Sequence, residues 1–124
     1  MGCGSSKDDG ATARGGYALG GPKGFTYDEI NQCFKARNGL LFRLVDTNSG
    51  RWAYYNDSKQ YDMRVTVIFG PDSEIEPIGR TEMDVDEETG DFICMTVVPP
   101  GKTELFIEGE VRGFVSKIDA VPHD

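Results

Sequence analysis

The sequence is poor in the residues that bind metals and carry out nucleophilic catalysis. It has one histidine, His123, and three cysteines, none of them in a CxxC pair. A protein zinc site needs closely spaced nitrogen and sulfur ligands, and a catalytic cysteine needs an imidazole within hydrogen-bonding reach. His123 follows Pro122 in the C-terminal tail, far from Cys33 and Cys94 in sequence. We therefore expect no metal, no cofactor and no catalytic residue, and a protein that is not an enzyme.

Long apolar runs and a basic charge balance are also missing. No stretch is apolar for long enough to form a transmembrane helix, and the N-terminus lacks the apolar region of a secretory signal. The chain has 13 Lys and Arg against 21 Asp and Glu, a formal net charge of −8, which disfavours nucleic acid as a partner. These absences predict a protein made and kept on the cytosolic side.

The first seven residues contain the most specific motif of the chain. Met1-Gly2-Cys3-Gly4-Ser5-Ser6-Lys7 fits the pattern M-G-x-x-x-[ST] of N-myristoylation, in which Met1 is removed and the Gly2 amine is acylated. Ser6 occupies the hydroxyl position of the motif, and Lys7 adds a charge that favours the anionic inner leaflet. Cys3, beside the acylated glycine, is the predicted palmitoylation site. The lipidation residues are thus Gly2 for myristate and Cys3 for palmitate.

Charge explains why a second lipid is expected. One myristoyl chain binds membranes only reversibly, with K on the order of 10⁴ M⁻¹, so stable attachment takes another signal. Residues 1–24 carry three basic and two acidic residues, which leaves −9 on residues 25–124 of a chain whose total is −8. An anionic leaflet repels such a body, which favours acylation of Cys3 over electrostatic docking. We predict a flexible, glycine-rich tether over residues 1–24 and one domain over residues 25–124.

The domain is predicted to be all-β. Alternating apolar residues or β-rich runs bounded by turn residues indicate about seven short strands, near 41–45, 51–55, 63–69, 81–86, 91–98, 104–108 and 114–118. Residues 46–50 and 87–90 read as hairpin loops. Such spacing is typical of a single antiparallel β-sandwich or open barrel. Before the strands, Thr26 and Glu29 have capping-box spacing and Ile30, Cys33 and Phe34 have helical spacing, which predicts a short helix ending near Asn38-Gly39.

Four aromatic residues around the first hairpin are candidates for a recognition surface. Trp52, Tyr54, Tyr55 and Tyr61 are of the types that dominate binding hot spots, although packing within and around the core is the commoner role. An open barrel could also leave a groove between its sheets that holds an apolar chain, including the protein's own myristate.

Charged side chains offer two further interpretations. The acidic run 84–91 fails the EF-hand pattern because Thr89 and Met95 stand where Gly and Glu are required, so a solvated turn is expected. Arg43, Arg64 and Arg80 could line one face, although such residues usually occupy the solvent side of strands.

Several blocks of the sequence resemble the small N-terminal domain of the kinetoplastid calpain-like proteins. They run in order through residues 25–122: 38–45 (NGLLFRLV), 52–57 (WAYYND), 69–70 (FG), 100–104 (PGKTE), 107–109 (IEG) and 113–118 (GFVSKI). The chain departs from the expected pattern at Tyr54, Pro99 and Lys102. The resemblance implies a domain without a protease domain and without catalytic residues. It also implies a location on the cytosolic face of the plasma membrane, at the flagellum.

The sequence thus predicts a non-catalytic, dually acylated inner-leaflet protein with a structural or adaptor role. We expect a monomer whose partners are membrane lipid, through the acyl chains, and a membrane or cytoskeletal protein. The alternative is a lipid-binding or apolar-ligand-binding module that sequesters an acyl chain.

Overall fold

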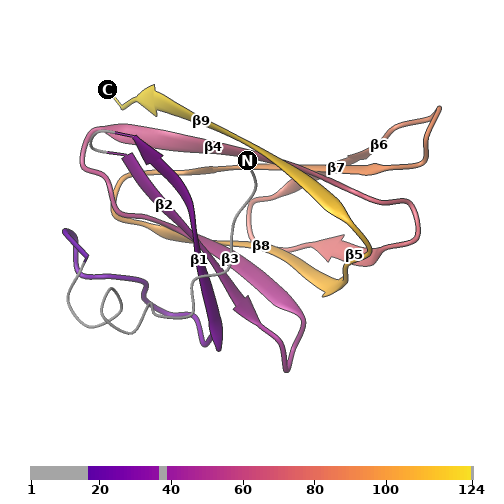
Figure 1. Cartoon of the computed structure of the whole chain (residues 1–124), viewed down its shortest axis with the longest axis horizontal. Helices are drawn as coiled ribbons and strands as arrows, with labels where there is room; N and C mark the ends of the chain where they lie inside the picture. Colours follow the sequence, from indigo (N-terminus) through magenta and orange to yellow (C-terminus); the bar gives the residue numbers. More distant parts are fainter. Residues whose placement is uncertain (1–16, 37–38, 124) are drawn as a thin grey trace.

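The protein folds as two antiparallel β-sheets packed face to face (Figure 1). The computed structural model describes residues 17–36 and 39–123, which form nine strands and no helix. Sheet A has the order β1-β2-β3-β8-β5 and sheet B the order β6-β7-β4-β9. The strands are β1 (Glu29–Ala36), β2 (Gly39–Asp46), β3 (Arg51–Asn56), β4 (Tyr61–Phe69), β5 (Glu74–Pro77), β6 (Glu82–Val85), β7 (Phe92–Val98), β8 (Thr103–Glu110) and β9 (Phe114–Pro122). The predicted β-sandwich is confirmed.

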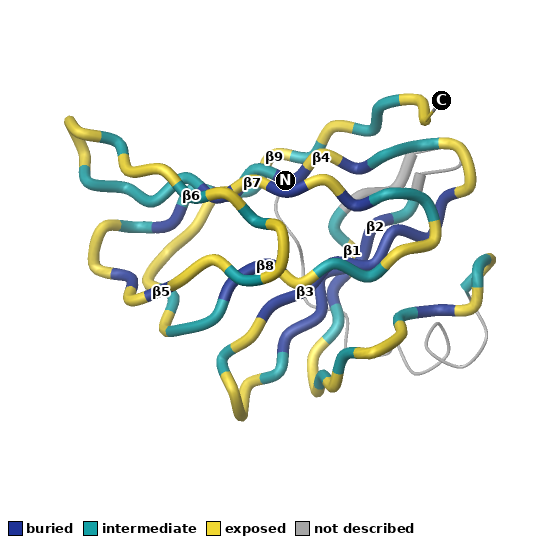
Figure 2. Tube along the Cα trace, turned by 180° about the vertical axis from the view of Figure 1, so that it is seen from behind, coloured by how far each residue is buried: buried dark blue, intermediate teal, exposed yellow. Residues whose placement is uncertain are grey.

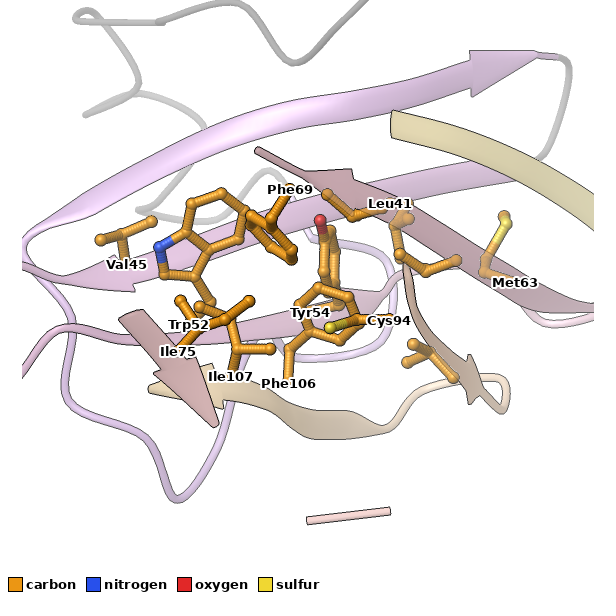
Figure 3. Packing of buried hydrophobic residues seen from close by; sticks show 13 residues of the cluster. Leu41, Val45, Trp52, Tyr54, Met63, Phe69, Ile75, Cys94, Phe106 and Ile107 are labelled. Carbon is orange, nitrogen blue, oxygen red and sulfur yellow. The ribbon is translucent and has the colours of Figure 1, made fainter. Parts of the chain in front are cut away.

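The main hydrophobic core lies between the two sheets (Figure 3). Along β4 the burial alternates, with Met63, Val65, Val67 and Phe69 buried and the residues between them more exposed, as Figure 2 shows. This is the period of two expected for a strand with one face on the core and one toward solvent. The cluster of buried residues also includes Leu41, Val45, Trp52, Tyr54, Ile75, Cys94, Val98, Phe106 and Ile107. Cys94 therefore occupies the core, as its place in an apolar strand predicted.

A second, smaller cluster covers the outer face of sheet A. Phe42, Leu44, Ala53 and Tyr55 are buried there beneath the chain that precedes and begins β1. Because β3 lies under both clusters, its residues from Trp52 to Asn56 are all buried and show no alternation. The partly buried residues that cover this face are Tyr17, Phe25, Tyr27, Ile30 and Leu40.

The helix predicted between residues 25 and 38 is wrong, because this segment contains strand β1. β1 pairs antiparallel with β2 from Glu29 opposite Val45 to Ala36 opposite Gly39, with a bulge between Gln32 and Phe34. A bulge interrupts the alternation of a strand, which made the apolar spacing resemble a helical one. Asp28, at the expected helix start, instead binds the turn after β2, where it accepts a hydrogen bond of 2.9 Å from the Thr47 N–H.

The seven predicted strands correspond to β2, β3, β4 and β6 to β9, and both predicted hairpin loops are confirmed. In the first loop the Gly50 N–H donates to the Asp46 carbonyl at 2.8 Å, and in the second the Gly90 N–H donates to the Asp86 carbonyl at 2.7 Å. The sequence did not indicate β5, because Glu74–Pro77 offers one apolar residue, Ile75, in a short charged segment. In the part of the chain that the structure describes, no helix is long and apolar enough to cross a membrane.

Candidate functional site

The predicted lipidation residues lie outside the described part of the chain. Gly2 and Cys3, together with the supporting Ser6 and Lys7, precede residue 17, where the description begins. What the structure does show is how the chain that follows them is joined to the domain.

Residues 17–24, which we call the N-terminal clasp, are hydrogen-bonded to sheet A. The Asp57 carboxylate accepts bonds from the backbone N–H groups of Ala18, at 2.8 Å, and Leu19, at 2.9 Å. Farther along, the Gly21 N–H donates to the Tyr55 hydroxyl at 3.0 Å, and the Lys23 N–H donates to Thr103 Oγ1 at 3.1 Å. The sequence placed residues 17–24 in the flexible tether, whereas these bonds connect them to residues more than 30 positions away.

Aromatic packing strengthens the clasp. The Tyr17 ring meets the rings of Phe42 and Tyr55 edge to face, with centroid distances of 5.2 and 5.5 Å. The Tyr55 hydroxyl also donates a hydrogen bond of 2.7 Å to Asp57. Burial, with this bond to the carboxylate, raises the pKa of Tyr55 above its usual value, so the phenol remains a donor at neutral pH.

The four aromatic residues predicted as a recognition surface do not share a surface. Trp52 and Tyr54 are buried in the core between the sheets, and Tyr55 is buried in the cluster on the opposite face of sheet A. Tyr61 is partly buried against the main core. The structure therefore gives these rings packing positions, which is the commoner role that the sequence left open.

Arg43 is a buried cation, although an arginine in a strand usually occupies the solvent side. It is only 8% exposed, and its guanidinium lies 4.6 Å from the ring centroid of Trp52 and 5.0 Å from that of Phe114. Burial lowers the pKa of Arg43, while the charge of Glu29 acts in the opposite direction. Directly opposite on β3, Tyr54 has no exposed surface, and burial raises its pKa. A guanidinium between two aromatic faces is stabilised by cation–π attraction.

A surface groove lies on the outer face of sheet B. It has a volume of about 480 Å³ and is lined in part by Arg64, Arg80, Glu82 and Asp119. Two of the three arginines considered as lining one face, Arg64 and Arg80, thus do share a site. The space between the sheets, where a groove for an acyl chain was considered, is filled by the side chains of the core cluster (Figure 3).

The acidic run 84–91 covers the end of β6 and the turn that leads to β7. Asp86 stabilises this turn, because its carboxylate accepts hydrogen bonds from the backbone N–H groups of Glu88, at 2.8 Å, and Thr89, at 3.3 Å. Across residues 17–36 and 39–123 no group of His, Cys, Asp and Glu side chains is arranged to hold a metal ion.

One family model and two solved structures are similar to this chain. A family model described as a domain of unknown function (DUF1935) matches residues 17–123, a range that begins at the clasp. The solved structure of the small myristoylated protein SMP-1 from Leishmania major has a TM-score of 0.82 and 44% sequence identity, covering 98% of this chain and 89% of that one. A hypothetical protein of Leishmania major has a TM-score of 0.73 and 32% identity, covering 86% of this chain and 91% of that one. No curated protein matches the sequence. The chain belongs to the DUF1935 domain family.

Proposed function

We propose that this protein is a non-catalytic inner-leaflet membrane protein, attached through myristate on Gly2 and palmitate on Cys3. The observation that carries the proposal is the acylation motif, joined to a domain that is similar over 98% of the chain to a small myristoylated protein. That similarity supports the myristate in particular. Palmitoylation rests on the position of Cys3 and on the charge argument.

The N-terminal clasp sets the distance between anchor and domain. Fifteen residues separate the clasp from Met1, counting from Gly2 to residue 16. Even a fully extended chain of that length reaches only about 50 Å, so the domain stays close to the bilayer. A structural or adaptor role follows, in which the acyl chains hold the domain where it meets a membrane or cytoskeletal protein.

One feature of the described residues supports a role without catalysis. The Cys94 thiol is fully buried, and burial raises its pKa to about 11, which disfavours the nucleophilic thiolate at neutral pH. His123, which follows β9, holds its Nδ1 2.8 Å from Oδ1 of Asp62 on β4, but the buried thiol offers this imidazole no accessible nucleophile.

The calpain-like relationship and the flagellar location are finer parts of the proposal. They rest on the resemblance of the sequence blocks to calpain-like N-terminal domains and on a neighbour from a kinetoplastid, Leishmania major. We propose a monomer at the cytosolic face of the flagellar membrane.

Fractionation of acylation variants expressed in a kinetoplastid cell tests the proposal. Gly2→Ala removes the acyl acceptor and should move the protein from the membrane pellet to the supernatant. Cys3→Ser should leave a weakly bound, exchangeable pool, because one chain binds only reversibly. Ser5→Ala, at an unrestricted motif position, is the matched control and should fractionate like the parent. Intact mass of the native protein should show both acyl groups; membrane-bound Gly2→Ala or a native mass without lipid would refute the proposal.

A further inference from the structure

The groove on sheet B is a feature that membrane attachment through the N-terminus leaves unexplained. It lies on the face of sheet B turned away from sheet A, above strands β7 and β4, with Asp119 of β9 and Glu82 of β6 at its sides. Its volume of about 480 Å³ falls within the range of small-molecule sites.

The strand register brings charged side chains into one row across the groove. Arg64 on β4 pairs with Val97 on β7 and with Asp119 on β9. Glu82, the first residue of β6, pairs with Met95, and Arg80 lies in the turn just before β6, so it lines the β6 end of the groove.

The floor of the groove is apolar and open to solvent. Met95 is 41% exposed and Val97 is 45% exposed, and both line the groove. Exposed apolar side chains between two cations offer a place for the aliphatic part of a ligand whose polar group reaches the arginines.

The charged side chains that line the groove form no ion pairs with other residues in the described part of the chain. Its ion pairs join Arg51 to Glu108, Arg112 to Glu110 and His123 to Asp62, and none of them involves a groove residue.

The groove thus holds two guanidinium groups and two carboxylates, those of Glu82 and Asp119, with no ion pair among them. A ligand that carries both signs of charge can contact an arginine and a carboxylate at once, whereas a simple anion can use only the arginines.

We propose that this groove binds the zwitterionic headgroup of a phospholipid. The phosphate lies over Val97 between Arg64 and Arg80, the ammonium group faces Asp119, and the adjoining acyl region contacts Met95. The net charge of the chain, −8, favours this ligand over an anionic lipid, because a zwitterion is not repelled by the acidic body. The choice of a lipid rests on the proposed membrane attachment, and the binding itself uses other residues.

Titration of the unacylated full-length chain with soluble probes tests the groove. The probes are dihexanoylphosphatidylcholine below its micellar concentration, phosphocholine, inorganic phosphate and choline, followed by amide chemical shifts. We expect saturable shifts on β4 and β7 with the first two probes, and affinities at least about tenfold lower for phosphate or choline alone.

Two double variants and a control assign the site. Arg64→Gln with Arg80→Gln, and Glu82→Gln with Asp119→Asn, should each weaken binding of the short lipid by about tenfold or more. Arg51→Gln, whose side chain lies on sheet A, should leave it unchanged.

Three results would overturn the proposal: no shifts on β4 and β7, equal binding of phosphate alone, or equal loss in Arg51→Gln. Because the chain under test has no acyl group, these results are independent of the Gly2→Ala experiment, which decides the proposed function separately.

Discussion

The Tyr55 hydroxyl donates a 2.7 Å hydrogen bond to the Asp57 carboxylate, two residues along the chain. The same carboxylate accepts two backbone N–H groups of the clasp, and the same hydroxyl accepts a third, from Gly21. This pair of side chains therefore connects the segment that leads to the proposed lipid anchor with the middle strand of sheet A.

Asp57→Asn should loosen the clasp without unfolding the domain. The amide has one acceptor oxygen where the carboxylate has two, so at least one of the N–H groups of Ala18 and Leu19 loses its partner. Loss of one or two such bonds costs about 1–3 kcal/mol. Hydrogen exchange should show faster exchange at Ala18 and Leu19 while β4 remains protected. Asp72→Asn, at an exposed turn position, is the control, and equal protection of the clasp in both variants would contradict the assignment.

The contacts of the clasp could not be predicted from the sequence. Residues 1–24 are rich in glycine, and composition alone favours an unstructured linker over the whole segment. The contacts that order residues 17–24 come from Tyr55 and Asp57, more than 30 positions away, so no local pattern reveals them. In contrast, the alternation in β4 and the turn residues of the hairpins are local signals, and they predicted the sandwich correctly.

The positions of the arginines in the groove and in the core were likewise not predictable from local sequence patterns. Each of Arg43, Arg64 and Arg80 was identified as a candidate from its place in or near a strand. Strand register decides that Arg64 shares a row with Val97, while Arg43 faces the core beside Trp52. A shift of one residue would move each side chain to the opposite face of its sheet, and register was not available from the sequence.

Arg43→Ala should destabilise the domain by about 2–4 kcal/mol, because it removes both aromatic contacts and leaves a void in the core. Arg43→Lys keeps the charge but loses the planar group that stacks on the rings, so it should recover only part of the loss. Urea unfolding followed by the fluorescence of Trp52, the single tryptophan, measures the change. Arg64→Ala, at an exposed strand position, should stay within about 0.5 kcal/mol of the parent. Equal stability of the two alanine variants would argue against the cation–π contact.

Alkaline pH should unfold the domain through its buried phenols. Burial raises the pKa of Tyr54 and Tyr55 above the ordinary value of 10.0. Below that pH both the folded and unfolded chains keep these protons. Above it the unfolded chain loses them while the folded chain retains them, so the free energy of unfolding falls as pH rises, by about 1.4 kcal/mol per pH unit for each group. Cys94, with its pKa raised from 9.0 to about 11, adds a loss that starts near pH 9.

Urea unfolding between pH 9 and 12 tests whether the free energy of unfolding falls as pH rises. Tyr54→Phe should reduce the slope of stability against pH above 10 by about 1.4 kcal/mol per unit. Phe106→Leu, at a ring 5.1 Å from Tyr54, should lower stability at every pH and leave the slope unchanged. A parent protein whose stability rises or stays level from pH 10 to 12 would contradict the burial of these phenols.

Gly109→Ala should be among the most damaging single substitutions in sheet A. Gly109 has a φ of 137°, and a Cβ atom there would lie 2.1 Å from the backbone oxygen of Glu74 on β5. Because that contact is with backbone, relief requires β5 to separate from β8, at a cost of about 3–5 kcal/mol. Gly113→Ala is the matched control, since its φ is also positive, at 78°, but no atom lies within 4 Å of the added carbon. It should cost only the conformational strain of about 1 kcal/mol. Thermal unfolding that ranks Gly113→Ala as equally damaging would show that backbone conformation, and not the approach of β5, makes glycine necessary at 109.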